Sequence, residues 1–308
     1  DAFANAMKLV TDNMAGGIRA MLFIDCEFAN AGRMNFELQN HTNDGVCRYA
    51  NIHFVRPRII GAGQHSPVVG MGLSFSGKGD HVTLDAPYFD GNLGPQLENA
   101  GCDRLLVRNA AIRAATAPVD VPAISFSGRS MAHNGNAQCE IDGLTLVRGT
   151  GDPGGRQSLR SEMEFTVSQN LTLRRIKVGV ESDGGSNGRS IMSLSGTGND
   201  DDGVPNDCGP VTIEGCDFWS DAFNKPLIAM NTMNGPQRII GNTLANSNPS
   251  RVGPLIAAFA QTGAEAYSVH LSGNSMDAAV PHAETSFVFR NNAAQVSVAD
   301  DNTGLPVH

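Results

Sequence analysis

Residues 138–149 read Gln-Cys-Glu-Ile-Asp-Gly-Leu-Thr-Leu-Val-Arg-Gly, and this stretch decides the fold. Two apolar residues alternate with polar ones, the pair Asp142-Gly143 interrupts the alternation, and two more apolar residues resume it. Alternation with a period of two is typical of a β-strand that buries one face. The stretch therefore predicts two short strands that are joined by a sharp break.

The same pattern recurs along the chain about ten times, at irregular intervals of about 30 residues. A short unit that repeats with variable insertions predicts a solenoid whose insertions emerge as loops. Gly or Asn occupies the second break position in five units, and these residues adopt positive φ at low cost, so a sharp bend is expected there. The units begin near residues 22, 52, 82, 105, 139, 171, 211, 237, 269 and 296, and the five bend residues are Asn109, Gly143, Gly215, Gly241 and Gly273.

A further short apolar alternation precedes most units and predicts a third strand in each coil. Examples are residues 72–76, 123–127, 162–166, 191–195, 227–230 and 286–289. Three short strands per coil, stacked in parallel, make a three-sided prism with a continuous ladder of apolar side chains inside. Over nearly its whole length the chain resembles the right-handed parallel β-helix of the pectate-lyase-like superfamily. The resemblance implies an all-β, three-sheet solenoid of about ten coils, with residues 1–308 as one domain.

Residues 1–20 are open to two interpretations. Phe3, Ala6, Met7 and Val10 have helical spacing, and Asp1 is a suitable N-cap, so a helix could cover the open end of the prism. Alternatively, residues 7–10 form a strand of an incomplete first coil, which would imply that an N-terminal region is missing.

Composition narrows the classes of partner. The chain holds 35 Gly but only three Tyr and one Trp, and its formal net charge is −9. A net negative surface disfavours nucleic acids and anionic membranes. No apolar run approaches the ~20 residues of a membrane span, so no membrane insertion is expected. The chain starts at Asp1 without a signal peptide, as a mature or trimmed chain would, which leaves secretion open.

The cysteines are expected to be structural. Cys26, Cys139 and Cys216 fall on apolar positions of the repeat, where a thiol acts as a small apolar group. Cys102 and Cys208 lie three coils apart, and at ~4.8 Å per coil they are too far apart to form a disulfide. The chain has no Cys-x-x-Cys motif, so a zinc site is not expected.

Glu162 and Glu164 are the first candidates for chemistry. Met163 and Phe165 match inward residues of other units, so alternation predicts that both carboxylates point outward, ~6.6 Å apart along one strand. That separation suits a general acid and base for glycoside cleavage, with one pKa raised by the other charge. The alternative is that these are ordinary charged outward positions without a function.

Four long insertions crowd the middle coils, and loops that gather on a rigid scaffold often form the site. Asp200, Asp201 and Asp202 lie in one of them, where Asp201 is a candidate base and the cluster a candidate Ca²⁺ site; the alternative is an exposed acidic turn. Candidate substrate-binding residues are Arg129, Arg156 and Arg160 with nearby His133, and Trp219, whose side chain is expected to point outward. The basic residues could instead neutralise the two glutamates. The four insertions are residues 127–138, 149–160, 179–189 and 195–210.

Two functions follow from these features. The resemblance implies an extracellular, polysaccharide-degrading protein: a lyase, a glycoside hydrolase or a phage tailspike depolymerase. The alternative is a non-catalytic structural or adhesive β-helix, such as a phage tail fibre segment or a surface adhesin, which the low aromatic content favours. A polysaccharide is the expected partner. A homotrimer that packs outward apolar residues such as Ile228 and Val288 would point to a phage fibre. No cofactor is expected other than Ca²⁺ at the aspartate cluster.

Overall fold

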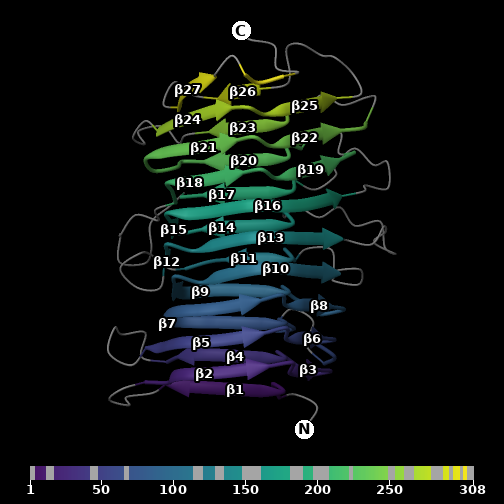
Figure 1. The fold of residues 1–308 in the computed structure, drawn as a ribbon, viewed down its shortest axis with the longest axis vertical. Helices are drawn as coiled ribbons and strands as arrows, with labels where there is room; N and C mark the ends of the chain where they lie inside the picture. The colour runs from purple at the N-terminus through teal and green to yellow at the C-terminus, as the bar shows by residue number, and fades with distance from the viewer. Residues whose placement is uncertain are drawn as a thin grey trace.

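Alternating apolar side chains line three parallel sheets that wind around one core, and the computed structural model is a right-handed parallel β-helix of ten coils (Figure 1). This confirms the predicted fold class. The structure describes residues 4–11, 17–41, 48–65, 69–113, 121–128, 135–147, 161–180, 190–196, 208–221, 225–248, 254–259, 267–278, 287–290, 294–298 and 301–303.

Each sheet takes one strand, or one part of a longer strand, from successive coils. The first sheet contains β1 (Met7–Thr11), β4 (Phe36–Asn40), the first part of β7 (Leu73–Asp85), β9 (Leu97–Asp103), β11 (Ile124–Phe126), β14 (Met163–Thr166), β17 (Met192–Ser195), β20 (Ile228–Asn231), β23 (Ile256–Phe259) and β26 (Phe287–Arg290).

The second sheet contains β2 (Arg19–Ile24), β5 (Tyr49–Val55), the second part of β7, the first parts of β10 (Leu106–Arg113), β13 (Glu140–Val147) and β16 (Leu171–Val180), then β18 (Val211–Glu214), β21 (Pro236–Ile240), β24 (Tyr267–Ser272) and β27 (Ala294–Val298). The third sheet contains β3 (Glu27–Ala29), β6 (Arg58–Ile60), β8 (Tyr88–Asp90), the second parts of β10, β13 and β16, then β19 (Asp217–Ser220), β22 (Thr243–Asn246) and β25 (Ser275–Ala278). A separate pair is formed by β12 (Asn136–Ala137) and β15 (Ser168–Gln169).

The sharp bend between the second and third sheets lies where the sequence predicts it. The residue at the bend has positive φ, with 51° at Asn109 and 78° at Gly143. Arg56 and Arg175 adopt the same conformation, with φ of 50° and 49°. The bend is therefore a requirement of the coil geometry, and residues other than Gly and Asn also meet it.

Inward side chains stack on their counterparts in neighbouring coils and form one apolar core. Ile141, for example, pairs in register with Val107 and Leu173, and all three are buried. Cys139 and Cys216 are buried in this core, as predicted, while Cys26 near the N-terminal end is half-buried. Burial raises the pKa of Cys139 to about 12 and that of Cys216 to about 11. Cys102 and Cys208 are buried and form no disulfide bond with each other, as predicted.

Asparagines replace apolar residues just after the bend in the last coils. The Asn242 backbone N–H and side-chain amide both donate to Asn274 Oδ1, at 3.0 and 2.9 Å, and Asn274 makes the same two bonds to Asn302. Their side chains also donate to carbonyl groups of the preceding coils, such as Asn274 Nδ2 to Ile239 O at 2.8 Å. Because every amide is paired, polar side chains are tolerated inside the solenoid here.

Two predictions about local structure are corrected. Residues from Met7 onward form strand β1, so the N-terminal helix is wrong there and the strand alternative is confirmed; residues 1–3 lie outside the described part. Ile228 is fully buried in the core, because it pairs with inward Met192, so it cannot pack against another subunit. The Val288 side chain lies outside the described part.

Among the described residues, no helix is long and apolar enough to cross a membrane.

Candidate functional site

Glutamate and serine alternate in one outward column on the first sheet. Each member lies between two inward residues of its strand and pairs in register with the next coil. At ~4.8 Å per coil, successive glutamates are separated by about 10 Å along the axis. We call this set the Glu/Ser column, and in coil order it contains Glu37, Ser74, Glu98, Ser125, Glu164 and Ser193.

The three glutamates of the column have different surroundings. Glu37 is buried, accepts a hydrogen bond from Asn5 Nδ2 at 2.6 Å and lies 3.2 Å from Lys8 Nζ, so its charge is compensated. Glu98 Oε2 accepts a hydrogen bond from Ser74 Oγ at 2.6 Å, and no cation is its partner among the described ion pairs. Burial raises the pKa of Glu98, and the charge of Glu37 adds to the shift. Glu98 therefore holds a proton more readily than an ordinary exposed glutamate does.

The predicted outward pair of Glu162 and Glu164 does not exist. Glu164 is half-buried on β14, as alternation predicts, and its Oε1 accepts from the Ser161 backbone N–H at 3.2 Å. Glu162 is fully buried and precedes β14 at the corner between sheets, where strand alternation no longer applies. Its backbone links three coils: its N–H donates to Ser190 O at 3.1 Å, and its carbonyl accepts from Ala123 N–H at 2.7 Å. The catalytic roles of both glutamates remain predictions.

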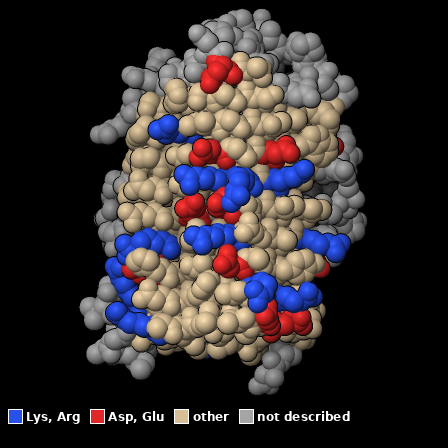
Figure 2. All heavy atoms as spheres, viewed as in Figure 1, with Lys and Arg blue, Asp and Glu red and all other residues tan. Residues whose placement is uncertain are grey.

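Bands of basic and acidic side chains alternate along the solenoid axis on the face shown in Figure 2. One column of the second sheet alternates in charge over five successive coils, from Asp85 through Arg108, Asp142 and Arg174 to Glu214. Arg174 lies between acids of both neighbouring coils: its Nε is 3.0 Å from Glu214 Oε2, and its Nη1 is 3.2 Å from Glu140 Oε1. The outward charges of this face thus form contacts between coils.

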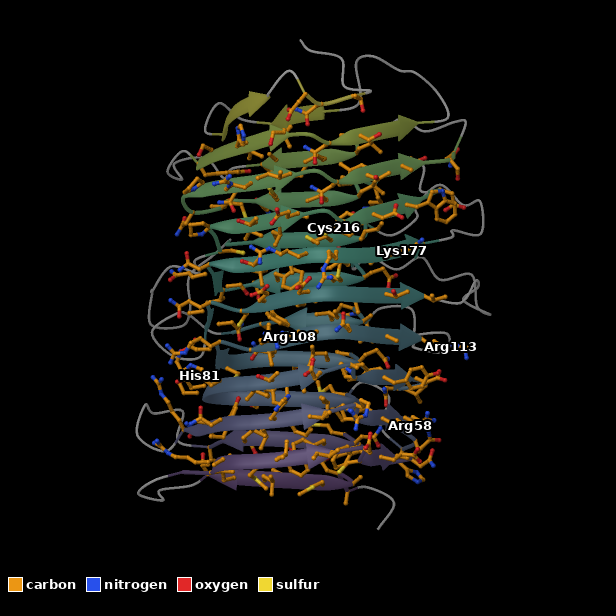
Figure 3. All side chains as sticks on the ribbon, viewed as in Figure 1. Arg58, His81, Arg108, Arg113, Lys177 and Cys216 are labelled. Carbon is orange, nitrogen blue, oxygen red and sulfur yellow. The ribbon has the colours of Figure 1, made fainter. Side chains whose placement is uncertain are left out.

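The bend and the third sheet continue the alternation. At the bend, Arg56 Nε lies 2.7 Å from Asp25 Oδ1, and Arg175 Nε lies 2.6 Å from Asp142 Oδ1. These hydrogen bonds lower the pKa of both aspartates. Basic residues of alternate coils, Arg58, Arg113 and Lys177, project along one side of the solenoid (Figure 3). Arg58 Nε is 3.1 Å from Glu27 Oε2, and the other two lie 4.0 and 3.7 Å from carboxylates of adjacent coils.

Trp219 is half-buried on β19, beside the inward Phe218, so the predicted outward direction is confirmed. Its in-register neighbours are Gly179 in the preceding coil and Ala245 in the following one. Small residues on both sides leave the faces of the indole without a large neighbour in its own column. An indole in this setting suits stacking on a flat ligand such as a sugar ring.

The remaining predicted site residues lie outside the described part of the chain and stay predictions. They are Arg129, His133, Arg156, Arg160, Asp200, Asp201 and Asp202. Within the described residues, no group of three or more His, Cys, Asp or Glu side chains is arranged to hold a metal ion.

Glu37 and Glu98 were missed by the sequence reasoning, although a signal for them exists. Glu37 occupies the middle of an apolar-x-apolar triplet, as Glu164 does, and Glu98 follows the apolar Leu97 in the equivalent strand. Aligning the third strand of every coil, in addition to the strands around the bend, would have shown the alternation of Glu and Ser.

The geometry defines the class of protein as a right-handed parallel β-helix. No protein-family model matches the chain, and no curated protein sequence matches it. Two solved structures are similar in fold, both of PfbA, a surface adhesin of Streptococcus pneumoniae. The first has a TM-score of 0.46 and 10% identity and covers 94% of this chain and 87% of PfbA. The second has a TM-score of 0.44 and 11% identity and covers 92% of each chain.

Proposed function

We propose that the chain is a non-catalytic, adhesive β-helix that works outside the cell and binds polysaccharide without cleaving it. The observation that carries the proposal is the alternation of charge over successive coils. Outward Arg and Asp or Glu side chains face each other between coils, at 2.6 to 3.2 Å in the closest pairs, so these charges stabilise a rigid rod. Glu162 is fully buried and therefore does not stand beside Glu164 as an exposed carboxylate pair, which supports a non-catalytic function.

The binding surface in this proposal includes the third sheet around Trp219. Its indole has small neighbours in both adjacent coils, and Lys177 and Asp217 lie nearby in register as hydrogen-bonding groups for hydroxyls. Buried, unpaired thiols with raised pKa values suit a protein that meets an oxidising environment, because the reactive thiolate is scarce. Membership of the pectate-lyase-like superfamily is part of the same proposal, supported by the three-sheet coil.

A panel of acidic and neutral polysaccharides tests the proposal. We expect binding to at least one immobilised polysaccharide, with no new reducing ends and no absorbance from unsaturated products. Trp219→Ala should weaken binding about 3- to 10-fold, the value of one aromatic stacking contact. Tyr88→Ala is the matched control, because the Tyr88 ring on the same sheet is already covered by the Arg58 guanidinium at 5.3 Å. Absence of binding across the panel would refute polysaccharide as the partner.

A second candidate is a glycan hydrolase that uses the Glu/Ser column, with Glu98 as general acid and Glu164 as general base. The specific observations are the raised pKa of Glu98 and the two-coil separation of about 10 Å, which is near the range of ~6.5–9.5 Å found in inverting glycosidases. Turnover that is abolished by both Glu98→Gln and Glu164→Gln would establish this function and overturn the adhesive one.

A further inference from the structure

The outward face of the second sheet carries one column of side chains that alternates in charge in its middle and is apolar at both ends. Every member of the column is exposed or half-exposed. The charged bands to which its middle belongs cross the face shown in Figure 2. We call this set the central column, and in coil order it contains Ile24, Val55, Asp85, Arg108, Asp142, Arg174, Glu214 and Ile240.

The apolar ends of this face are exposed to water. Leu22 and Ile24 on β2, in the first coil, are 59% and 51% exposed, and both point away from the core. Ile240 on β21, in the eighth coil, is half-exposed at the other end of the central column. Apolar groups in these positions gain free energy when a partner covers them. A partner that covers both ends must also match the charges between them.

The alternation of charge selects one way in which this face can pack against the same face of a second copy. With parallel solenoid axes, a two-fold axis sets each coil against the same coil of the partner, so every charge of the central column meets its own sign. With antiparallel axes and the two-fold axis midway between two coils, odd-numbered coils face even-numbered ones. Because the charge alternates from coil to coil between Asp85 and Glu214, opposite signs then meet.

We propose that the second sheet binds the second sheet of another copy of this chain, with antiparallel solenoid axes and a two-fold axis between β10 and β13. The facing pairs of the central column are then Ile24 with the partner's Ile240, Asp85 with the partner's Arg174, and Arg108 with the partner's Asp142. Val55 with the partner's Glu214 is the single pair without complementary chemistry. A two-fold axis between β13 and β16 also pairs opposite charges, but it sets Asp85 against the partner's apolar Ile240, so the first register fits better.

The area of the contact fits a weak, reversible dimer. The eight coils from β2 to β21, at ~4.8 Å each, and a sheet about five residues wide, at ~3.3 Å each, give about 600 Å² per copy. The total of about 1,200 Å² lies at the lower end of the range for specific interfaces. The charges already have partners within each chain, so they fix orientation and register more than affinity. Trp219 lies beyond the bend, on the third sheet, and stays outside this contact.

Two charge reversals in separate chains test the orientation. Asp85 and Arg174 lie three coils apart, about 14 Å along the axis of one chain, but they face each other across the proposed interface. In a homodimer of Asp85→Arg or of Arg174→Glu, like charges meet at both of these positions. In the heterodimer of the two variants, opposite charges meet at both. Sedimentation velocity at low salt measures association of each variant alone and of a 1:1 mixture, and circular dichroism checks that each variant is folded.

We expect the 308-residue chain to dimerise with a Kd in the micromolar range, each reversal to raise that Kd at least about 10-fold, and the mixture to recover most of the loss.

The apolar end of the interface is tested separately. Ile24→Ser should weaken the dimer at least about 3-fold. Val147→Ser is the matched control, because Val147 is similarly exposed, at 54%, but lies on the third sheet, and this change should leave the Kd as it is.

Three results would overturn the proposal: a chain that stays monomeric up to about 1 mM or forms trimers, a mixture that associates no better than its components, or equal effects of the two serine variants. None of these measurements involves a polysaccharide, so this proposal and the adhesive function fail separately.

Discussion

Reversing the charge of Arg174 should weaken the stacking of the middle coils. Arg174 contacts Glu214 at 3.0 Å and Glu140 at 3.2 Å, and all three side chains are between a third and a half exposed. Exposed pairs of this kind contribute about 0.5 kcal/mol each, so Arg174→Gln should cost about 1 kcal/mol. Arg174→Glu would also place like charges in successive coils. Their repulsion adds about 1 kcal/mol to the loss of stability, at a separation of about 5 Å and the high dielectric constant of a solvent-exposed site.

The expected loss for Arg174→Glu is therefore about 2 kcal/mol, or a fall in Tm of about 3 °C for a chain of 308 residues. The assay is thermal unfolding followed by circular dichroism at low salt and at about 1 M salt, where the Debye length falls to ~3 Å. At high salt, more than half of the difference between Arg174→Glu and Arg174→Gln should disappear.

Arg238→Glu is the matched control. Arg238 is exposed on the same sheet, but its in-register neighbours are Thr212 and His270, and no ion pair joins it to a described carboxylate. The change in net charge is identical. If both reversals lower Tm equally, or if salt leaves the difference unchanged, the charges do not stabilise the coils and the reasoning is refuted.

Three further changes probe the interior and the Glu/Ser column. Asn274→Ala should cost about 2–4 kcal/mol in urea unfolding, because it leaves buried backbone and amide groups without partners; a loss below 1 kcal/mol would contradict this. Glu98→Gln should raise the free energy of unfolding at pH 7, because the pKa of Glu98 in the folded chain lies above the unfolded value of 4.5 and ionisation of this carboxyl favours unfolding. Below about pH 4 the gain should vanish, since the carboxyl is then protonated in both states. A gain that does not change with pH would argue against a raised pKa of Glu98. Thiol labelling of the folded chain near pH 8 should modify Cys139 and Cys216 at least 100-fold more slowly than half-buried Cys26, and equal rates would show that the core opens.

Much of the fold was accessible from local pattern. The alternation around Ile141 predicted the strands, and Gly143 with Asn109 predicted the bend, because both reflect constraints on single residues and their neighbours. Glu162 was misplaced for the complementary reason. Alternation of inward and outward side chains applies only within a strand, and β14 begins one residue later, at Met163. The alternation therefore predicted an outward side chain for Glu162, whereas this side chain is buried.

The sequence by itself determined the period, the inward residues and the cysteine environments, because these depend on which side chains leave water. Only the tertiary structure decided which residues meet between coils. Asp142 and Arg174 lie in adjacent coils, and Glu98 and Glu164 have one coil between them. Because the insertions differ in length from coil to coil, the distance along the sequence does not reveal which residues pair. Hydrogen bonding between successive coils sets that register, and the register determines which side chains meet in the Glu/Ser column and in the alternating column from Asp85 to Glu214.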